Sequence, residues 1–427
     1  MNTRTNRRRS VALLLIGLAM TGQAWAAEPL ALTEALAIAR ANHPQVEEAA
    51  AGLAAAEAKQ GQAMAGFLPK VDLSADWSRG ESYFTVLGAI KETELATTAL
   101  TVRQTLLDFG RTGGAYAAAR GGRQAAEQTV AASRQDVTLR LKSAWYLLGS
   151  TGQLVAASRK TVEAREALFR QASEFFSHGV RSRVEKSRAE ANLLAAKSLL
   201  LRAENNHELA RLELANAMGL PALPDRELVW DEGGGEAGIG GDVAALREEA
   251  MAARPEMKRL AGLAEAAAGG LRAARGGYLP TVSGIASVGE AAKSVLPEES
   301  VWTVGVTVNL PLFSGFSTRE QVREAEAGQR AVAAQHKNLR LQVAREVDAA
   351  WLASREAEAR VAASQQEFVA ARDGEALAMA RYREGVGSLV EAIDAQAQAM
   401  NAESALIQAR YDGKIAMARL ERALGRE

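Results

Sequence analysis

The most constraining feature of this sequence is that it repeats itself. Residues 66–69 read GFLP and residues 277–280 read GYLP, and each phrase leads into a segment of alternating polarity. Pro69 and Pro280 are 211 positions apart, and Pro44 and Pro255 share that offset. Two independent marks at one spacing indicate a tandem duplication.

A second set of marks has an offset of 206 positions. The pairs that share it are Trp145 with Trp351, Gly179 with Gly385, Val180 with Val386, and Met218 with Leu424. The first copy therefore carries five extra residues between Pro69 and Trp145. These marks predict a first repeat over 27–221, a linker over 222–241 and a second repeat over 242–427.

Residues 1–26 have the composition of a secretory signal peptide. MNTRTNRRRS is basic, VALLLIGLAM is apolar, and Ala24-Trp25-Ala26 offers the small residues of a cleavage site. An apolar run of about ten residues is half of what a membrane-spanning helix needs, so we expect export and cleavage. The absence of cysteine excludes disulfides, thiolate metal sites and a lipid on an N-terminal cysteine.

Charge and composition exclude further classes of function. Lys plus Arg and Asp plus Glu both number 51, so no broad basic surface is expected for nucleic acid. Hydrophobic residues make up 48% of the chain but aromatic residues only 5%, because much of the apolar content is alanine. Together with only 9 prolines, this composition is typical of long helices.

Two segments alternate strictly between apolar and polar residues, which is the pattern of a strand with one apolar face. The apolar positions are Trp302, Val304, Val306, Val308 and Leu310 in one segment, and Val71, Leu73, Ala75 and Trp77 in the other. Weaker alternation covers 97–107 and 281–289. Each repeat is therefore predicted to hold one strand pair, within 70–107 and within 281–310.

Two separate strand pairs would not be stable alone, because a two-stranded ribbon is marginal in water. Strands of about ten residues with one apolar face and small polar residues on the other match the wall of a transmembrane β-barrel. Closure of such a barrel removes every exposed strand edge.

The remaining sequence predicts long helices. Residues 112–177 contain no proline, and a seven-residue spacing joins Leu141, Leu148, Val155, Val162, Phe169 and Phe176. The second repeat has Val347, Val361, Phe368 and Tyr382 at equivalent places, with Ser354 and Glu375 interrupting. A helix of about 65 residues would be roughly 100 Å long and needs neighbours along its length, as in a coiled coil.

A glycine is expected to end each long helix and start a hairpin. Gly179 and Gly385 each follow an apolar seam, and Ser182 or Ser388 is placed to cap the next helix. Each repeat is then predicted to run as helix, strand pair, long helix, glycine turn and long helix.

This arrangement resembles the outer-membrane efflux protein family, the TolC-like exit ducts. The resemblance covers essentially the whole mature chain and is carried by LTEALAIARANHPQV, GFLP, GYLP, LLDFGR, PLFSGF and YREGVGSLVEAIDAQ. Any one of these phrases is a weak match, whereas their order and double occurrence are specific.

The resemblance implies a mixed α and β fold. Three chains would share a transmembrane β-barrel, with four strands from each, above a periplasmic tunnel of α-helical coiled-coil hairpins. It also implies an outer-membrane location with a large periplasmic part, a homotrimer in outer-membrane lipid, a periplasmic adaptor (membrane fusion) protein and an inner-membrane pump of RND or ABC type. Such a duct conducts passively, is no enzyme and carries no cofactor or metal.

The resemblance also assigns roles near the turns. Glu391 and Asp394 share a helix face, and the family carries lumen-facing acids there, so three chains would form a ring of six carboxylates that attracts cations. An ordinary solvated face is the alternative. Glu185 and Tyr382 match positions that hold neighbouring turns together in the closed state.

One position departs from the family, because Gly387 stands where the best-known members carry an arginine. Fewer ion pairs, or Arg181 or Arg183 from the other turn, would then hold the closed state. Candidates for the adaptor contact are Gly179, Val180, Gly385 and Val386. The alternative is that these glycines only permit a tight turn.

The sequence also contains features that bear on functions other than a duct. Gly233, Gly235 and Gly238 satisfy GxGxxG, but no further strand and helix alternation follows to build a nucleotide-binding sheet. A type I polypeptide secretion component and a poreless periplasmic coiled-coil scaffold remain alternatives. Exposure of the apolar face around Trp302 in water would favour aggregation, which argues against the scaffold. Drug, metal ion, solvent and polypeptide all remain possible cargo.

Overall fold

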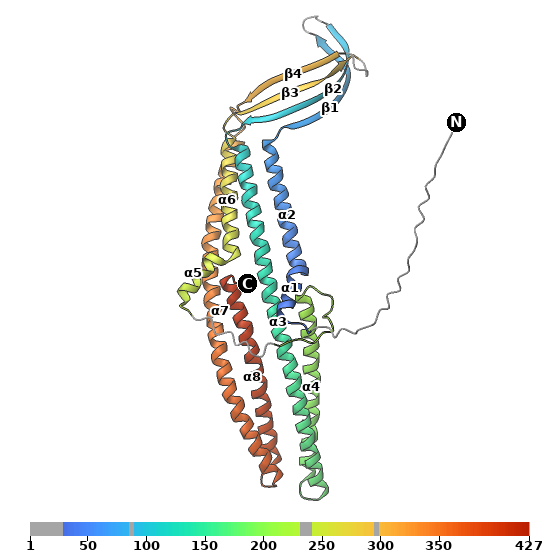
Figure 1. Cartoon of the computed structure of the whole chain (residues 1–427), viewed down its shortest axis with the longest axis vertical. Coiled ribbons are helices and arrows are strands. Elements are labelled where there is room, and N and C mark those ends of the chain that lie inside the picture. Colours follow the sequence, from blue (N-terminus) through green and yellow to red (C-terminus); the bar gives the residue numbers. More distant parts are fainter. Residues whose placement is uncertain (1–28, 85–88, 231–240, 294–298, 427) are drawn as a thin grey trace, which may run out of the picture.

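The computed structural model describes residues 29–84, 89–230, 241–293 and 299–426. The predicted signal peptide and the GxGxxG glycines lie outside these residues. Figure 1 shows a long bundle of helices with a sheet across one end. Among the described residues, no helix combines the length and the apolar character needed to cross a membrane.

The helices and strands follow the order that each repeat predicts. The helices are α1 (Leu32–Asn42), α2 (Pro44–Met64), α3 (Arg111–Ser177), α4 (Arg183–Ala217), α5 (Val243–Ala253), α6 (Pro255–Gly276), α7 (Ser317–Arg383) and α8 (Leu389–Leu424). The strands are β1 (Lys70–Phe84), β2 (Ala89–Leu107), β3 (Thr281–Ala292) and β4 (Glu299–Asn309).

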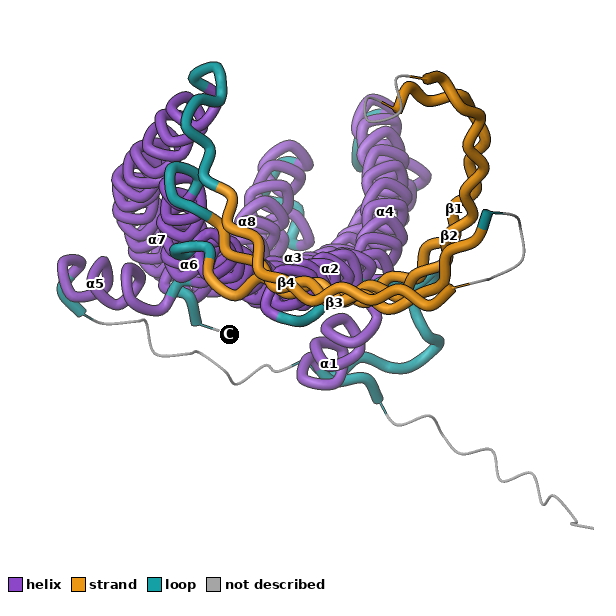
Figure 2. The backbone as a smooth tube through the Cα atoms, turned by 90° about the horizontal axis from the view of Figure 1, so that it is seen from above, coloured by secondary structure: helices purple, strands orange, loops and turns teal. Residues whose placement is uncertain are grey.

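The described strands form one antiparallel sheet in the order β1-β2-β3-β4. The two predicted pairs are thus joined through β2 and β3, where Arg103 lies opposite Ile285. Figure 2 shows the sheet curving over the end of the helices. Side chains on both faces of β1 and β4 are largely exposed, so the described part of the chain leaves these two edge strands uncovered.

The GFLP and GYLP phrases lie at the predicted boundary between helix and strand. Helix α2 ends at Met64, a short 3₁₀ turn covers Ala65–Phe67, and β1 begins one residue after Pro69. Pro280 likewise stands immediately before β3. Proline lacks the N–H that a continuing helix would need, which explains the change of structure at both places.

The seam predicted along α3 is only partly correct. Leu141, Leu148 and Val155 are buried, but Phe176 is 39% exposed. Closer to the turn that follows α3, the buried positions are instead Leu168, next to the seam position Phe169, and Ala172. A straight helix has 3.6 residues per turn and drifts from a seven-residue spacing, so the buried face moves off the predicted positions.

The equivalent seam along α7 shows the same drift. Val347 and Tyr382 are buried as predicted, whereas Val361 and Phe368 are only partly buried. Ser354, which the sequence indicated as an interruption, is buried. A small hydroxyl is therefore tolerated inside this helix pair.

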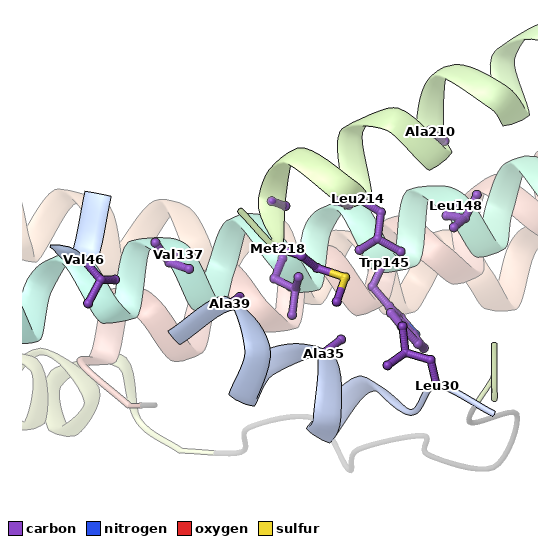
Figure 3. Packing of buried hydrophobic residues seen from close by; sticks show 13 residues of the cluster. Leu30, Ala35, Ala39, Val46, Val137, Trp145, Leu148, Ala210, Leu214 and Met218 are labelled. Atoms are coloured by element: carbon purple, nitrogen blue, oxygen red, sulfur yellow. The ribbon is translucent and has the colours of Figure 1, made fainter. Parts of the chain in front are cut away.

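A hydrophobic cluster packs α1, α2, α3 and α4 of the first repeat together (Figure 3). Its members are Leu30, Ala35, Ala39, Val46, Val137, Leu141, Ala144, Trp145, Leu148, Ala210, Leu214, Ala217 and Met218. The described part of the predicted linker also packs here, because Leu228 pairs with Leu30 and Trp230 lies 5.3 Å from Trp145 between ring centroids.

Helices α3 and α6 approach closely enough for their backbones to touch. A Cβ added at Gly121 would lie 2.5 Å from both the amide nitrogen of Ala266 and the carbonyl oxygen of Gly262. One heptad earlier, a Cβ at Gly114 would lie 2.5 Å from the amide nitrogen of Ala273. Glycine is required at these positions because any side chain would force the two helices apart.

A network of ion pairs joins the second repeat to α3. Arg422 of α8 binds Asp136 of α3 at 2.8 Å and also binds Glu256 of α6. Arg254 binds Glu256 at 3.3 Å. Burial opposes ionisation of Glu256, but the hydrogen bond and charge of Arg422, with Arg254, prevail and hold the pKa of this carboxyl below its usual value.

This lowered pKa predicts acid sensitivity that depends on Glu256. A carboxyl with a depressed folded-state pKa stabilises the fold above its unfolded value of about 4.3, and that stability is lost as pH falls through the folded value. We expect the thermal midpoint of the wild type to fall below about pH 4.5. Glu256→Gln should lower the midpoint at pH 7 and flatten this decline, and equal declines would contradict the assignment.

Candidate functional site

Both helical turns lie at the end of the molecule opposite the sheet (Figure 1). Gly179 and Gly385 have φ of 69° and 78°, in the left-handed region that glycine adopts at little cost. The hydroxyl of Ser388 accepts a hydrogen bond from the Glu391 amide at 3.1 Å, and Ser182 caps α4 in the same way. The predicted glycine turns and serine caps are thus confirmed.

Val180 and Val386 are 65% and 73% exposed at the tips of the two turns. Their amides donate to the carbonyls of Phe175 and Arg381 at 2.9 Å and 3.0 Å, which fixes the turn and leaves the side chains outside. These apolar tips are available for a partner, while the glycines account for the turn geometry.

Arg181 is the residue that joins the two turns. Its Nη2 donates to the carbonyl oxygens of Gly385 and Gly387, each at 3.2 Å. Its Nη1 lies 3.7 Å from Glu185, one turn further along. Of the two arginines named from the sequence, Arg181 therefore makes the contact across the turns.

Gly387 is required by packing as well as being a departure from the family pattern. A Cβ there would lie 2.9 Å from the amide nitrogen of Tyr382 and 3.0 Å from the side chain of Arg381. An arginine could not occupy this backbone position without moving the turn. Arg181 supplies a cation to this turn from the other hairpin.

Glu185 and Tyr382 lie close together beneath Arg181. The Tyr382 ring is fully buried and packs edge-on against Phe175 at 5.9 Å between centroids. Its hydroxyl and Glu185 Oε2 are buried without hydrogen-bond partners. Burial and the charge of Glu185 raise the pKa of Tyr382, while Arg181 opposes that shift. Tyr382 and Glu185 therefore lie near each other but form no hydrogen bond with each other.

Glu391 and Asp394 both lie exposed on the first turns of α8, on either side of the buried Ile393. Arg381 binds Glu391 at 3.2 Å. A single chain does not bring these carboxylates into a closed constriction, so the predicted ring depends on assembly.

The sequence profile of the family described as "Outer membrane efflux protein" matches residues 35–220 and 246–426. The chain belongs to this family. It is similar to the outer membrane efflux protein BepC of Brucella suis biovar 1, with 24% identity over 420 residues that cover 98% of this chain and 90% of BepC. It is also similar to the outer membrane protein TolC of Escherichia coli, with 24% identity over 442 residues, covering 96% and 85%.

The fold of this outer membrane efflux protein agrees with that of a solved outer-membrane channel. The outer-membrane channel OprN superposes with a TM-score of 0.82 at 21% identity, covering 93% of this chain and 90% of OprN. The resemblance found in the sequence is thus confirmed, and so is an outer-membrane location with a large periplasmic part.

Sequence reasoning missed one charged residue in this efflux protein. Arg165 of α3 is only 6% exposed, and its Nη2 donates to the carbonyl oxygen of Ile393 on α8 at 3.1 Å. Burial lowers the pKa of Arg165, and Glu375 and Asp394 partly oppose that shift. The available signal was its place three residues after Val162, a core position of the predicted heptad.

Proposed function

We propose that this protein is the exit duct of a tripartite efflux or export system. Three copies would form one channel that passively conducts substrate from a periplasmic adaptor and an inner-membrane pump, of RND or ABC type, to the outside. The observation that carries the proposal is the uncovered sheet, whose two edge strands and apolar face need partners that one chain does not supply.

The apolar face of the sheet supports insertion into lipid. Trp302, Val304, Val306 and Val308 are each at least 64% exposed and follow one side of β4. In water such a surface would promote aggregation, whereas lipid accommodates it. If β4 of one chain pairs with β1 of the next, three sheets close into a barrel without free edges.

The tandem repeat supports the manner of assembly. Helices α3 and α7 are both 67 residues long, and α1 and α5 are both 11 residues long. Within the chain, α3 of the first repeat packs on α6 of the second. The equivalent pairing would place α7 of one chain on α2 of the next, and Figure 1 shows these two helices on opposite flanks of the α3–α6 pair.

Native mass and a designed crosslink test this proposal together. Gly121 faces Ala266 across α3 and α6, and the repeat offsets carry this pair to Ala327 and Ala55, where the methyl group of Ala327 would hold α7 and α2 further apart than α3 and α6. Because the chain lacks cysteine, Ala327→Cys with Ala55→Cys should give a covalent trimer under oxidation. Gly328→Cys with Ala55→Cys is the matched control, since the equivalent Gly122 has nothing within 4 Å.

The protein should be extracted from separated outer membranes as a trimer that carries this crosslink. A soluble periplasmic species, with strands that never enter a bilayer, would instead support the scaffold. A trimer crosslinked equally well by the control pair would contradict the repeat-based interface.

We propose further that Glu391 and Asp394 form a cation-attracting constriction in the trimer. Replacing both by alanine should leave assembly intact and weaken the cation preference of the pore, because six carboxylates would leave one ring. The reversal potential in a planar bilayer under a KCl gradient measures this preference. Glu367→Ala removes another exposed acid, on α7, and serves as control. An unchanged preference in the double variant would exclude the ring.

The exposed valines at the tips support a docking role for the turns. We place the adaptor contact at Val180 and Val386, held outward by Gly179 and Gly385. The cluster of Arg181, Glu185 and Tyr382 beside them would hold the closed state.

A further inference from the structure

Arg165 is a buried cation in the contact between the two hairpins. It lies on α3 three residues before Leu168, a member of the hydrophobic cluster that includes Tyr382, Leu389 and Ile393. Its Nη2 binds the Ile393 carbonyl, while Nη1 is buried without a hydrogen-bond partner. Burying a guanidinium with so few partners is costly, so its presence needs a reason.

Packing alone does not require an arginine at this place. The residue at the equivalent position of the second repeat, 206 positions later, is Ala371. The Ile393 carbonyl lies within helix α8, whose own backbone bonds already satisfy it. A buried charge can often be replaced by an apolar residue without loss of stability, so an apolar side chain could fill the site.

The position of Arg165 relative to the acids suggests what it does. The carbonyl that it binds belongs to the residue between Glu391 and Asp394 on α8. Asp394 and Glu375 of α7 interact electrostatically with its guanidinium. Among the described residues, no ion pair joins Arg165 to a carboxylate, so its charge acts on these acids from a distance.

We propose that Arg165 is a positioning residue that sets the ion selectivity of the acidic constriction. By holding α8 at Ile393, it fixes where Glu391 and Asp394 stand, and its positive charge offsets part of theirs. This inference rests on the proposed function, because it requires a trimer whose lumen those carboxylates line. A trimer would carry three such cations behind six acids.

The test compares a neutral and a charged replacement in the full-length channel. Arg165→Met keeps a long side chain but removes the charge, and Arg165→Lys keeps the charge. We expect Arg165→Met to raise the potassium-to-chloride permeability ratio at least about twofold, because three unit charges leave the trimer and each acts on the permeating ion through water and salt. Arg165→Lys should stay near the wild type. The reversal potential under a KCl gradient gives the ratio, and the temperature of trimer dissociation reports folding.

The outcomes separate this inference from the proposed function. An unchanged ratio for Arg165→Met in a conducting trimer would overturn the role of Arg165 and leave the duct intact. Equal shifts of the permeability ratio for Arg165→Met and Arg165→Lys would show a merely structural role of Arg165 and would also overturn the inference. If the Arg165→Met variant does not assemble, Arg165→Gln provides the neutral side chain. A wild-type protein that forms no conducting trimer would refute the proposed function, and the inference with it.

The acidic residues provide a second check. In the Glu391→Ala, Asp394→Ala background, Arg165→Met should raise the permeability ratio by less than in the wild type, because only the field of the guanidinium is then lost and no acids remain to be positioned. An equal rise in both backgrounds would show that Arg165 does not act through these acids and would overturn the inference.

Discussion

Gly121→Leu is expected to remove the folded trimer from the outer membrane. Even a methyl group at Gly121 would lie 2.5 Å from backbone atoms of Ala266 and Gly262, and backbone cannot rotate aside as a flexible side chain can. Overpacking of a well-filled contact costs about 1–3 kcal/mol, and we expect the upper end here. That is a large share of a stability of about 5–15 kcal/mol.

The neighbouring glycine provides the matched control. Gly122 has nothing within 4 Å of an added Cβ, and leucine has a higher helix propensity than glycine, so Gly122→Leu should be neutral or slightly stabilising. Trimer yield in outer membranes and the temperature of trimer dissociation are the measurements. A similar loss for both variants would mean that the α3–α6 contact is not the cause.

The contact between α3 and α6 could not be predicted from the sequence. Gly114 and Gly121, like Gly262 and Gly269, are spaced by seven residues, which is visible in the sequence. Which helices pair is a property of tertiary structure, and glycine within a helix otherwise only indicates lower helix propensity. The repeat is an inference from the sequence, whereas the close contact between α3 and α6 is visible only in the structure.

Local structure was predictable where a single residue type determines the backbone conformation. Pro69 and Pro280 end helices, Gly179 and Gly385 turn the chain, and alternation defines β1 and β4, because each depends only on near neighbours. Beyond Val155 the predicted seam of α3 was only partly correct, since the path of a long helix depends on its partners.

The candidate site was predictable only in part for the same reason. The sequence named Arg181 as one of several groups for the closed state, but only the structure shows that it binds carbonyls of the other turn. A backbone acceptor leaves no signature in sequence. Arg165 likewise binds a carbonyl, so no complementary acid could be sought for it.

We propose that the wild-type channel rests closed, and Arg181→Ala is then expected to convert it into a mostly open one. The two hydrogen bonds of the partly exposed Arg181 are together worth about 2 kcal/mol, so three chains opening together would lose roughly 6 kcal/mol of closed-state preference. A shift of about 5.5 kcal/mol moves a two-state equilibrium from 1:99 to 99:1. Single-channel conductance in planar bilayers should therefore rise several-fold.

Arg183→Ala is the matched control, because Arg183 is exposed in the same turn. It should keep the conductance of the wild type, and equal conductance in the two alanine variants would refute this role of Arg181. Arg181→Lys should be intermediate, because an ammonium could replace Nη2 at the two carbonyls but offers no second nitrogen like the Nη1 that lies near Glu185.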